Sequence, residues 1–141
     1  MRYLSIDYGV KRIGLAISDE DGVIAFPKET IKNDKNIFQI IGDILVKEKI
    51  QAFVIGDSRN ADNSQNKISG EINEFISELE KKFGLKVNKE KEFFSSYEAH
   101  GRMGKESKNA SLSGFNKTED IDAKAAAIIL QRYLDRKNKK L

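Results

Sequence analysis

The sequence contains no cysteine and no tryptophan, and it has one histidine and one proline among its 141 residues. Without cysteine there is no disulfide, no thiolate metal site and no cysteine nucleophile, which fits a reducing compartment. One histidine leaves few ways to bind zinc. Any metal site must therefore use carboxylate oxygens, which favours Mg²⁺ or Mn²⁺.

Long apolar runs are also absent. No segment approaches the roughly 20 apolar residues of a membrane helix. Asp7 interrupts the first apolar segment too early for a signal peptide. We therefore expect a cytoplasmic protein without membrane contact. We also expect a monomer or a weak homodimer. The length fits one domain, so we expect residues 1–141 to share a single hydrophobic core.

The charge of the chain is unevenly distributed. The net charge is +3, and residues 101–141 carry ten Lys or Arg against five Asp or Glu. A basic C-terminal third suits a polyanionic partner, because each neutralised phosphate releases counterions. A solvated, lysine-rich surface explains the same numbers equally well.

Hydrophobic spacing predicts an α/β fold that begins with three strands. Asp21-Gly22 is a hairpin signal between the second and third strands, and Pro27 is expected to end the third. This order predicts a five-stranded mixed sheet flanked by helices, with the first three strands antiparallel. The expected strands are 2–6, 13–18, 23–26, 52–55 and 85–87, and the expected helices are 34–49 (capped by Asp34), 68–83 (stopped by Gly84), 95–103 and 119–136.

Two segments lack this periodicity. Residues 104–118 are rich in Gly, Ser, Asn and Lys, which predicts a mobile basic loop. Residues 136–141 are polar and mostly basic, which predicts a frayed tail.

Three carboxylates stand where this architecture would bring side chains together. Asp7 ends the first strand, Glu92 lies just past the fifth, and Asp122 lies in the first turn of the last helix. In open sheets, sites form at the carboxyl ends of strands, and crowded acids need a cation. Each acid also has a structural interpretation: Asp7 as a turn residue, Asp122 as a partner of the helix dipole and Glu92 as a surface residue.

Motifs at both ends of the chain resemble one known family. Asp7-Tyr8-Gly9-Val10-Lys11-Arg12-Ile13-Gly14-Leu15-Ala16 is similar to its opening motif, D-(F/Y)-G-x-(K/R)-x-(I/T)-G-(L/V)-A. Residues 121–134 resemble its closing motif, (V/I)-D-x-x-A-A-x-x-I-L-x-x-(Y/F)-L, and residues 54–56 and 92–99 match weaker motifs between them. This is the YqgF-type (RuvX-like) family of RNase H-like proteins, called Holliday-junction-resolvase-like proteins or pre-16S rRNA nucleases.

The resemblance implies an RNase H-like fold and a metal-dependent nuclease that hydrolyses phosphodiester bonds in structured nucleic acid. It makes Asp7, Glu92 and Asp122 the catalytic acids that bind Mg²⁺ or Mn²⁺. It also implies processing of the 5′ end of pre-16S rRNA. Branched DNA of the Holliday-junction type is the alternative substrate, because the sequence does not show which groups would read the 2′-hydroxyl of RNA.

Two segments depart from the family pattern. Phe93 stands where the family has an arginine, and Gly56-Asp57-Ser58 replaces Gly-Leu-Pro. We hypothesise that Asp57 is a fourth metal ligand, although a loop-capping role explains it equally well. Both departures leave open a nucleic-acid-binding protein with weak or lost catalysis.

Basic residues near these motifs are candidates for phosphate contact. Lys11 and Arg12 follow Asp7 in the first hairpin, and Arg59 could replace the missing arginine. The other candidates for nucleic-acid binding are Arg102, Lys105, Lys108 and Lys117.

Overall fold

The computed structural model describes residues 1–57, 67–91 and 117–139. The helix predicted over 95–103 lies outside these residues. The observed elements are β1 (Tyr3–Asp7), β2 (Arg12–Ser18), β3 (Ala25–Lys32), α1 (Ile37–Glu48), β4 (Ala52–Asp57), α2 (Lys67–Phe83), β5 (Val87–Lys91) and α4 (Lys117–Lys139).

The strands form one mixed sheet in the order β3-β2-β1-β4-β5. β2 is antiparallel to both β1 and β3, whereas β4 is parallel to both β1 and β5. The prediction of a five-stranded mixed sheet that begins with three antiparallel strands is therefore confirmed. Because β1, β4 and β5 run in the same direction, their carboxyl ends meet at one edge of the sheet.

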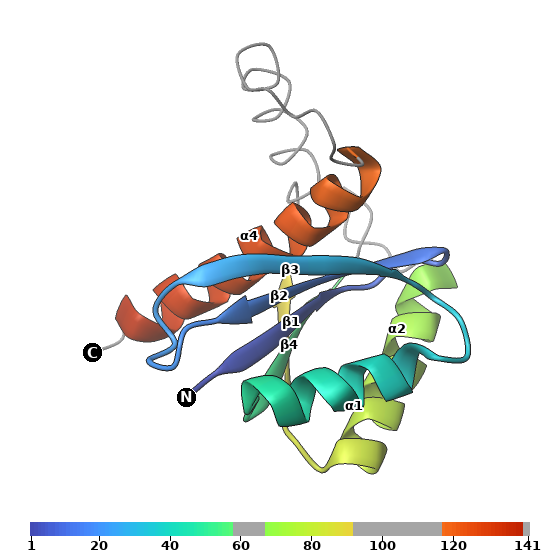
Figure 1. Ribbon diagram of the computed structural model, residues 1–141, viewed down its shortest axis with the longest axis horizontal. Helices are drawn as coiled ribbons and strands as arrows, with labels where there is room; N and C mark the ends of the chain where they lie inside the picture. The colour runs from blue at the N-terminus through green and yellow to red at the C-terminus, as the bar shows by residue number, and fades with distance from the viewer. Residues whose placement is uncertain (58–66, 92–116, 140–141) are drawn as a thin grey trace.

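Helices cover both faces of the sheet, with α1 and α2 on one side and α4 on the other (Figure 1). Side chains alternate along a strand, so β1, β2 and β4 each contribute buried residues to two cores. The core under α1 and α2 includes Leu4, Ile6, Phe53, Ile55, Ile41, Ile72 and Leu79. The core under α4 includes Tyr3, Ala16, Val54, Ala126, Ile129, Leu130 and Leu134.

Small residues let α4 approach the sheet closely. Ala123, Ala125 and Ala126 are buried, and the helix backbone lies nearest to β1, β2 and β3. The hydroxyl of Ser5 donates a hydrogen bond of 2.8 Å to the carbonyl oxygen of Ala126. The first half of α4 is thus held directly over β1.

The third strand is longer than predicted. β3 continues through Pro27 to Lys32, whereas the sequence predicted an end at Pro27. β3 is an edge strand, and its register against β2 shifts between Leu15 and Ala16. An edge strand with a bulge tolerates the missing N–H of proline.

The fifth strand and the first helix also differ from their predicted bounds. β5 covers Val87–Lys91 instead of 85–87, because the charged residues of this edge strand show no apolar run. Helix α1 begins at Ile37 with Asn36 as its N-cap, so the prediction that Asp34 caps it is wrong. The Asp34 carboxylate instead accepts a hydrogen bond of 2.9 Å from the Asn36 amide in the preceding turn. The stop at Gly84 is confirmed by its positive φ of 66°.

Helix α4 extends beyond both predicted ends. Residues 117 and 118, assigned to the basic loop, are helical, and residues 136–139, assigned to a frayed tail, are helical as well. Tertiary contacts hold the C-terminal end: Lys137 donates to the Tyr3 hydroxyl, and the Asn138 side chain donates to the Gly22 carbonyl at 3.2 Å. Residues 104–116 and 140–141 lie outside the described residues.

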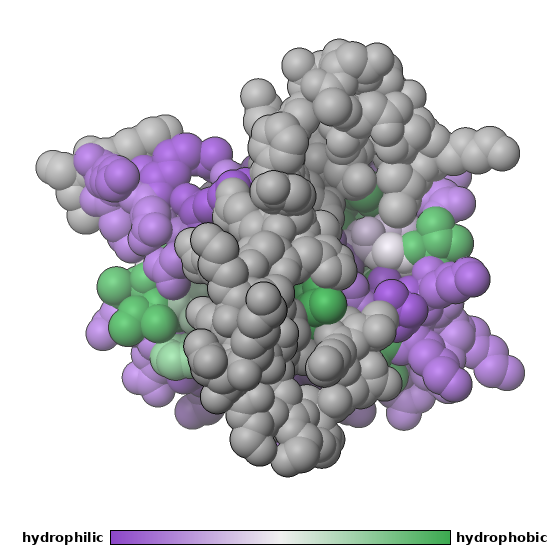
Figure 2. All heavy atoms as spheres, turned by 90° about the horizontal axis from the view of Figure 1, so that it is seen from above, coloured by the Kyte–Doolittle hydropathy of each residue, from purple (hydrophilic) through white to green (hydrophobic). Residues whose placement is uncertain are grey.

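The described surface in the view of Figure 2 is mostly hydrophilic, with separate apolar patches. Among the described helices, none is long and apolar enough to cross a membrane.

Candidate active site

Asp7 and Asp122 lie on either side of Gly14. Asp7 is the last residue of β1 and pairs with Gly14 of β2, and such antiparallel partners share one face of the sheet. The Asp122 backbone of α4 packs against Gly14 so closely that a Cβ atom there would lie 2.0 Å from the Asp122 carbonyl oxygen. The two acids from the first and last motifs are therefore neighbours.

The two carboxylates differ in exposure. Asp7 is 9% exposed, whereas the Asp122 side chain is 24% exposed. The Arg12 guanidinium donates a hydrogen bond of 2.8 Å from Nε to Oδ2 of Asp122. Neighbouring carboxylates repel unless cations offset their charges, and in this structure Arg12 supplies one such charge.

The donors at this site suit a hard cation. Asp7 and Asp122 offer carboxylate oxygens, the ligands that Mg²⁺ and Mn²⁺ prefer. Within the described residues no group of three His, Cys, Asp or Glu is placed to hold a metal ion. Glu92, the third predicted acid, lies outside those residues, so its role stays a prediction.

Asp57 reaches the same edge of the sheet as Asp7. It ends β4 in register with Lys91, and β4 runs parallel to β1. This position at the edge of the sheet is the observation that supports the hypothesis of a fourth ligand, and the role of Asp57 stays a prediction.

Three of the seven predicted phosphate contacts lie within the described residues. Lys11 lies in the turn after β1 and Arg12 is the first residue of β2; both are exposed, and Arg12 pairs with Asp122. Lys117 is the first residue of α4. The remaining candidates, Arg59, Arg102, Lys105 and Lys108, lie outside the described residues.

Sequence reasoning missed the role of Gly14. Gly14 was noted only as part of the opening motif. A glycine inside a strand often marks the close approach of another backbone, and this was the signal that could have identified its role. Sequence reasoning also missed Asn33, whose side chain donates a 2.8 Å hydrogen bond to the Gly9 carbonyl and so holds the turn that carries Lys11.

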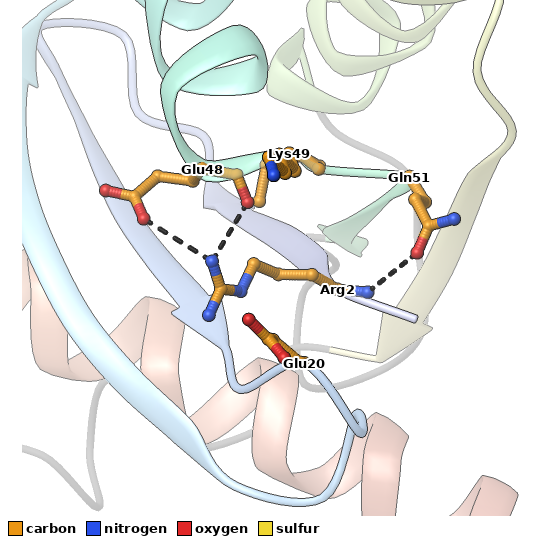
Figure 3. A pocket seen from close by; sticks show the side chains of 6 residues that line it. Arg2, Glu20, Glu48, Lys49 and Gln51 are labelled. Atoms are coloured by element: carbon orange, nitrogen blue, oxygen red, sulfur yellow. Dashed lines mark hydrogen bonds and ion pairs between the residues drawn. The ribbon is translucent and has the colours of Figure 1, made fainter.

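A separate hollow lies at the opposite edge of the sheet, where β1 and β4 begin (Figure 3). Arg2 donates to the Glu48 carbonyl at 3.0 Å and lies 3.6 Å from the Glu48 carboxylate. Lys28 also pairs with Glu48, at 3.3 Å. These contacts fasten the end of α1 to the sheet, which is a structural role.

Solved structures with the same fold include two Holliday junction resolvases. Residues of this chain superpose on Thermus thermophilus RuvC in complex with a Holliday junction substrate with a TM-score of 0.60 and 15% identity, covering 97% of this chain and 96% of that one. The fowlpox virus resolvase in complex with Holliday junction DNA gives a TM-score of 0.60 and 17% identity, covering 96% and 98%. At these identities the likeness shows the fold, which is RNase H-like.

Sequence relatives match across nearly the whole chain. A protein of Lawsonia intracellularis is 37% identical, covering 96% of this chain and 94% of its own length. One from Mycoplasmopsis synoviae is 37% identical, covering 96% and 98%, and one from Nitratidesulfovibrio vulgaris is 34% identical, covering 96% and 94%. All three carry the name "Putative pre-16S rRNA nuclease".

The family model described as "RuvX: Holliday junction resolvase" matches residues 1–136. This match contains both motifs whose acids meet across Gly14. The chain therefore belongs to the RuvX family.

Proposed function

We propose that this protein is a metal-dependent nuclease that hydrolyses phosphodiester bonds in structured RNA, with the precursor of 16S rRNA as its substrate. The observation that carries the proposal is the juxtaposition of Asp7 and Asp122 across Gly14. The names of relatives from three organisms support the RNA substrate.

The proposed roles of Asp7 and Asp122 follow from their positions on either side of Gly14, where they would hold Mg²⁺ or Mn²⁺. Glu92 is added as the third ligand of this ion on the family resemblance alone. Such an ion lowers the pKa of a bound water and stabilises negative charge on phosphate oxygens. Asp7 is buried on the α4 face, which limits its contact with bulk water. The packing of α4 against β1 holds the two acids in fixed positions relative to each other before the substrate binds.

A branched DNA substrate is the second candidate. The family model carries the name of Holliday junction resolvases, and two structural neighbours were solved with such junctions. Hydrolysis of DNA and RNA phosphodiesters needs the same acids, so the site supports both substrates. Binding without catalysis is the third candidate, favoured by the departures at Phe93 and Asp57.

Cleavage assays separate these candidates. The purified protein is incubated with Mg²⁺ and either an end-labelled pre-16S rRNA fragment or a four-way DNA junction. We expect RNA cleavage by the unchanged chain. Asp7→Asn and Asp122→Asn should each reduce the rate by more than the roughly 10- to 100-fold typical of changes around metal ligands.

Asp43→Asn is the matched control, because Asp43 is an exposed acid on α1. It should cleave like the unchanged chain. Preference for the junction would move the assignment to DNA. Binding of RNA with equal residual cleavage by the unchanged chain and Asp7→Asn would instead support the non-catalytic candidate.

A further inference from the structure

A second hollow lies directly beside the two acids. The turn between β1 and β2 forms one wall and the end of β3 forms the other. We call it the cationic groove, and its lining residues are Val10, Lys11, Arg12, Thr30, Ile31, Lys32, Asn33 and Asp34. Arg12 belongs to the groove and pairs with Asp122 at 2.8 Å, so the groove ends at the proposed reaction centre.

Hydrogen bonds join the two walls of the cationic groove. The Asn33 side chain donates to the Gly9 carbonyl at 2.8 Å, and the Asn33 amide donates to the Lys11 carbonyl at 3.0 Å. The shape of the groove is therefore set by the protein itself. A preformed site binds without the free-energy cost of ordering its own loop.

Positive charges face one another in the groove. Arg12 and Lys32 are directly opposed on β2 and β3, and like charges in this arrangement are destabilising. Within the described residues, Arg12 pairs with Asp122, whereas Lys11 and Lys32 form no ion pair. Both lysines are exposed. A bound anion would offset their repulsion.

Negative charge borders the groove on its other side. An adjoining hollow shares Asn33 and Asp34 with the cationic groove, and α2 lines it with Glu71, Glu74 and Glu78. All charged residues among its described lining are acidic. A polyanion would therefore be drawn along the cationic groove and repelled from the neighbouring hollow.

We propose that the cationic groove binds the sugar–phosphate backbone of the substrate strand on one side of the cleavage point. Lys11 and Lys32 contact successive phosphates, and Arg12 marks the inner end of this path beside Asp122. The position of the cleavage point rests on the proposed function, but binding of the backbone does not.

Binding without metal tests the groove separately from catalysis. Fluorescence anisotropy in EDTA measures the affinity for a labelled RNA hairpin and a four-way DNA junction over a series of salt concentrations. The double variant Lys11→Gln/Lys32→Gln should lower the affinity on the order of 30-fold at ~0.1 M salt, because each lost phosphate contact removes counterion release. The slope of log affinity against log salt should fall by about 1.4 to 1.8.

Lys47→Gln/Lys81→Gln is the matched control, since it removes the same charge from exposed positions on α1 and α2. Its salt slope should equal that of the unchanged chain. The proposal would be overturned if the groove variant kept the salt slope of the unchanged chain. It would also be overturned if both double variants lost the same amount of slope. If the groove variant alone loses affinity while Mg²⁺ supports no cleavage by the unchanged chain, the groove holds and the proposed function fails.

Discussion

Arg12 has one negatively charged partner in the protein, Asp122, and a second that we propose, a phosphate of the substrate. Its contact with Asp122 is partly solvated, with the two side chains 46% and 24% exposed. Exposed ion pairs of this kind contribute about 0–1 kcal/mol. The loss of this ion pair would therefore cost little if, as proposed, a divalent cation bound Asp122 and a phosphate entered the cationic groove.

Asp57→Asn tests the fourth predicted ligand at the scale of one residue. We expect weaker Mn²⁺ binding by isothermal titration calorimetry, with a smaller loss than Asp7→Asn causes. The loss should be smaller because Asp7 lies beside Asp122, whereas Asp57 ends the neighbouring strand β4 at the same edge of the sheet. Affinity equal to that of Asp43→Asn and of the unchanged chain would remove Asp57 from the site.

At the scale of elements, α4 brings Asp122 close to β1 because the helix face that packs on the sheet carries small side chains. Ala123 and Ala126 are buried, and Gly14 opposes the helix backbone without a side chain. A larger residue at any of these positions would separate the helix from the sheet. The distance between the acids therefore depends on residues that have no chemistry of their own.

Gly14→Ala should disrupt both stability and the site. The added Cβ would lie 2.0 Å from the Asp122 carbonyl oxygen, a backbone atom that moves only if α4 moves. We expect the free energy of unfolding to fall by at least about 2 kcal/mol, as overpacking commonly does. Urea denaturation measures this loss, and titration with Mn²⁺ should show weaker binding by the folded variant.

Gly70→Ala is the control for this substitution. Gly70 lies in α2, and a Cβ there would meet nothing within 4 Å. Alanine in a helix interior is favoured over glycine by roughly 0.5–1 kcal/mol, so this variant should be slightly more stable than the unchanged chain. A Gly14→Ala variant with unchanged stability and Mn²⁺ affinity would contradict the close packing of α4.

At the scale of the whole molecule, the end of α4 is tied to the far edge of the sheet. Arg136 Nη2 lies 2.6 Å from Oε1 of Glu90 on β5, and the guanidinium also lies over the Tyr133 ring. Among the described residues this Glu90 oxygen has a charge partner but no aligned hydrogen bond. Together with the contacts of Lys137 and Asn138, the pair explains why the expected frayed tail is helical.

Arg136→Ala should lower the free energy of unfolding by about 1–3 kcal/mol, because the Glu90 carboxylate is buried and would lose a counter-charge. The expected loss of stability is smaller than for a fully buried ion pair, since the Arg136 side chain is 53% exposed. Chemical denaturation of Arg136→Ala, Glu90→Gln and the double variant gives the coupling free energy of the pair. Additive effects in this cycle would show that the two side chains do not interact.

Much of the fold could be predicted because hydrophobic periodicity is a local property. The meander, the apolar strand β4 and the stop of α2 at Gly84 all followed from nearby residues. The extension of β3 beyond Pro27 could not be predicted from nearby residues. A proline is tolerated there because β3 is an edge strand with a bulge against β2. The true ends of α4 likewise depend on residues far away in the chain.

The sequence by itself determined the chemical type of the candidate site. It has no cysteine and one histidine, so a metal site must use oxygen ligands, and Asp7 and Asp122 lie in recognisable motifs. Only the tertiary structure decided that these acids meet across Gly14, and that Lys32 completes a groove with Lys11 and Arg12. The physical reason is that composition and spacing act along the chain, whereas strand register and helix packing bring together residues that are distant in sequence.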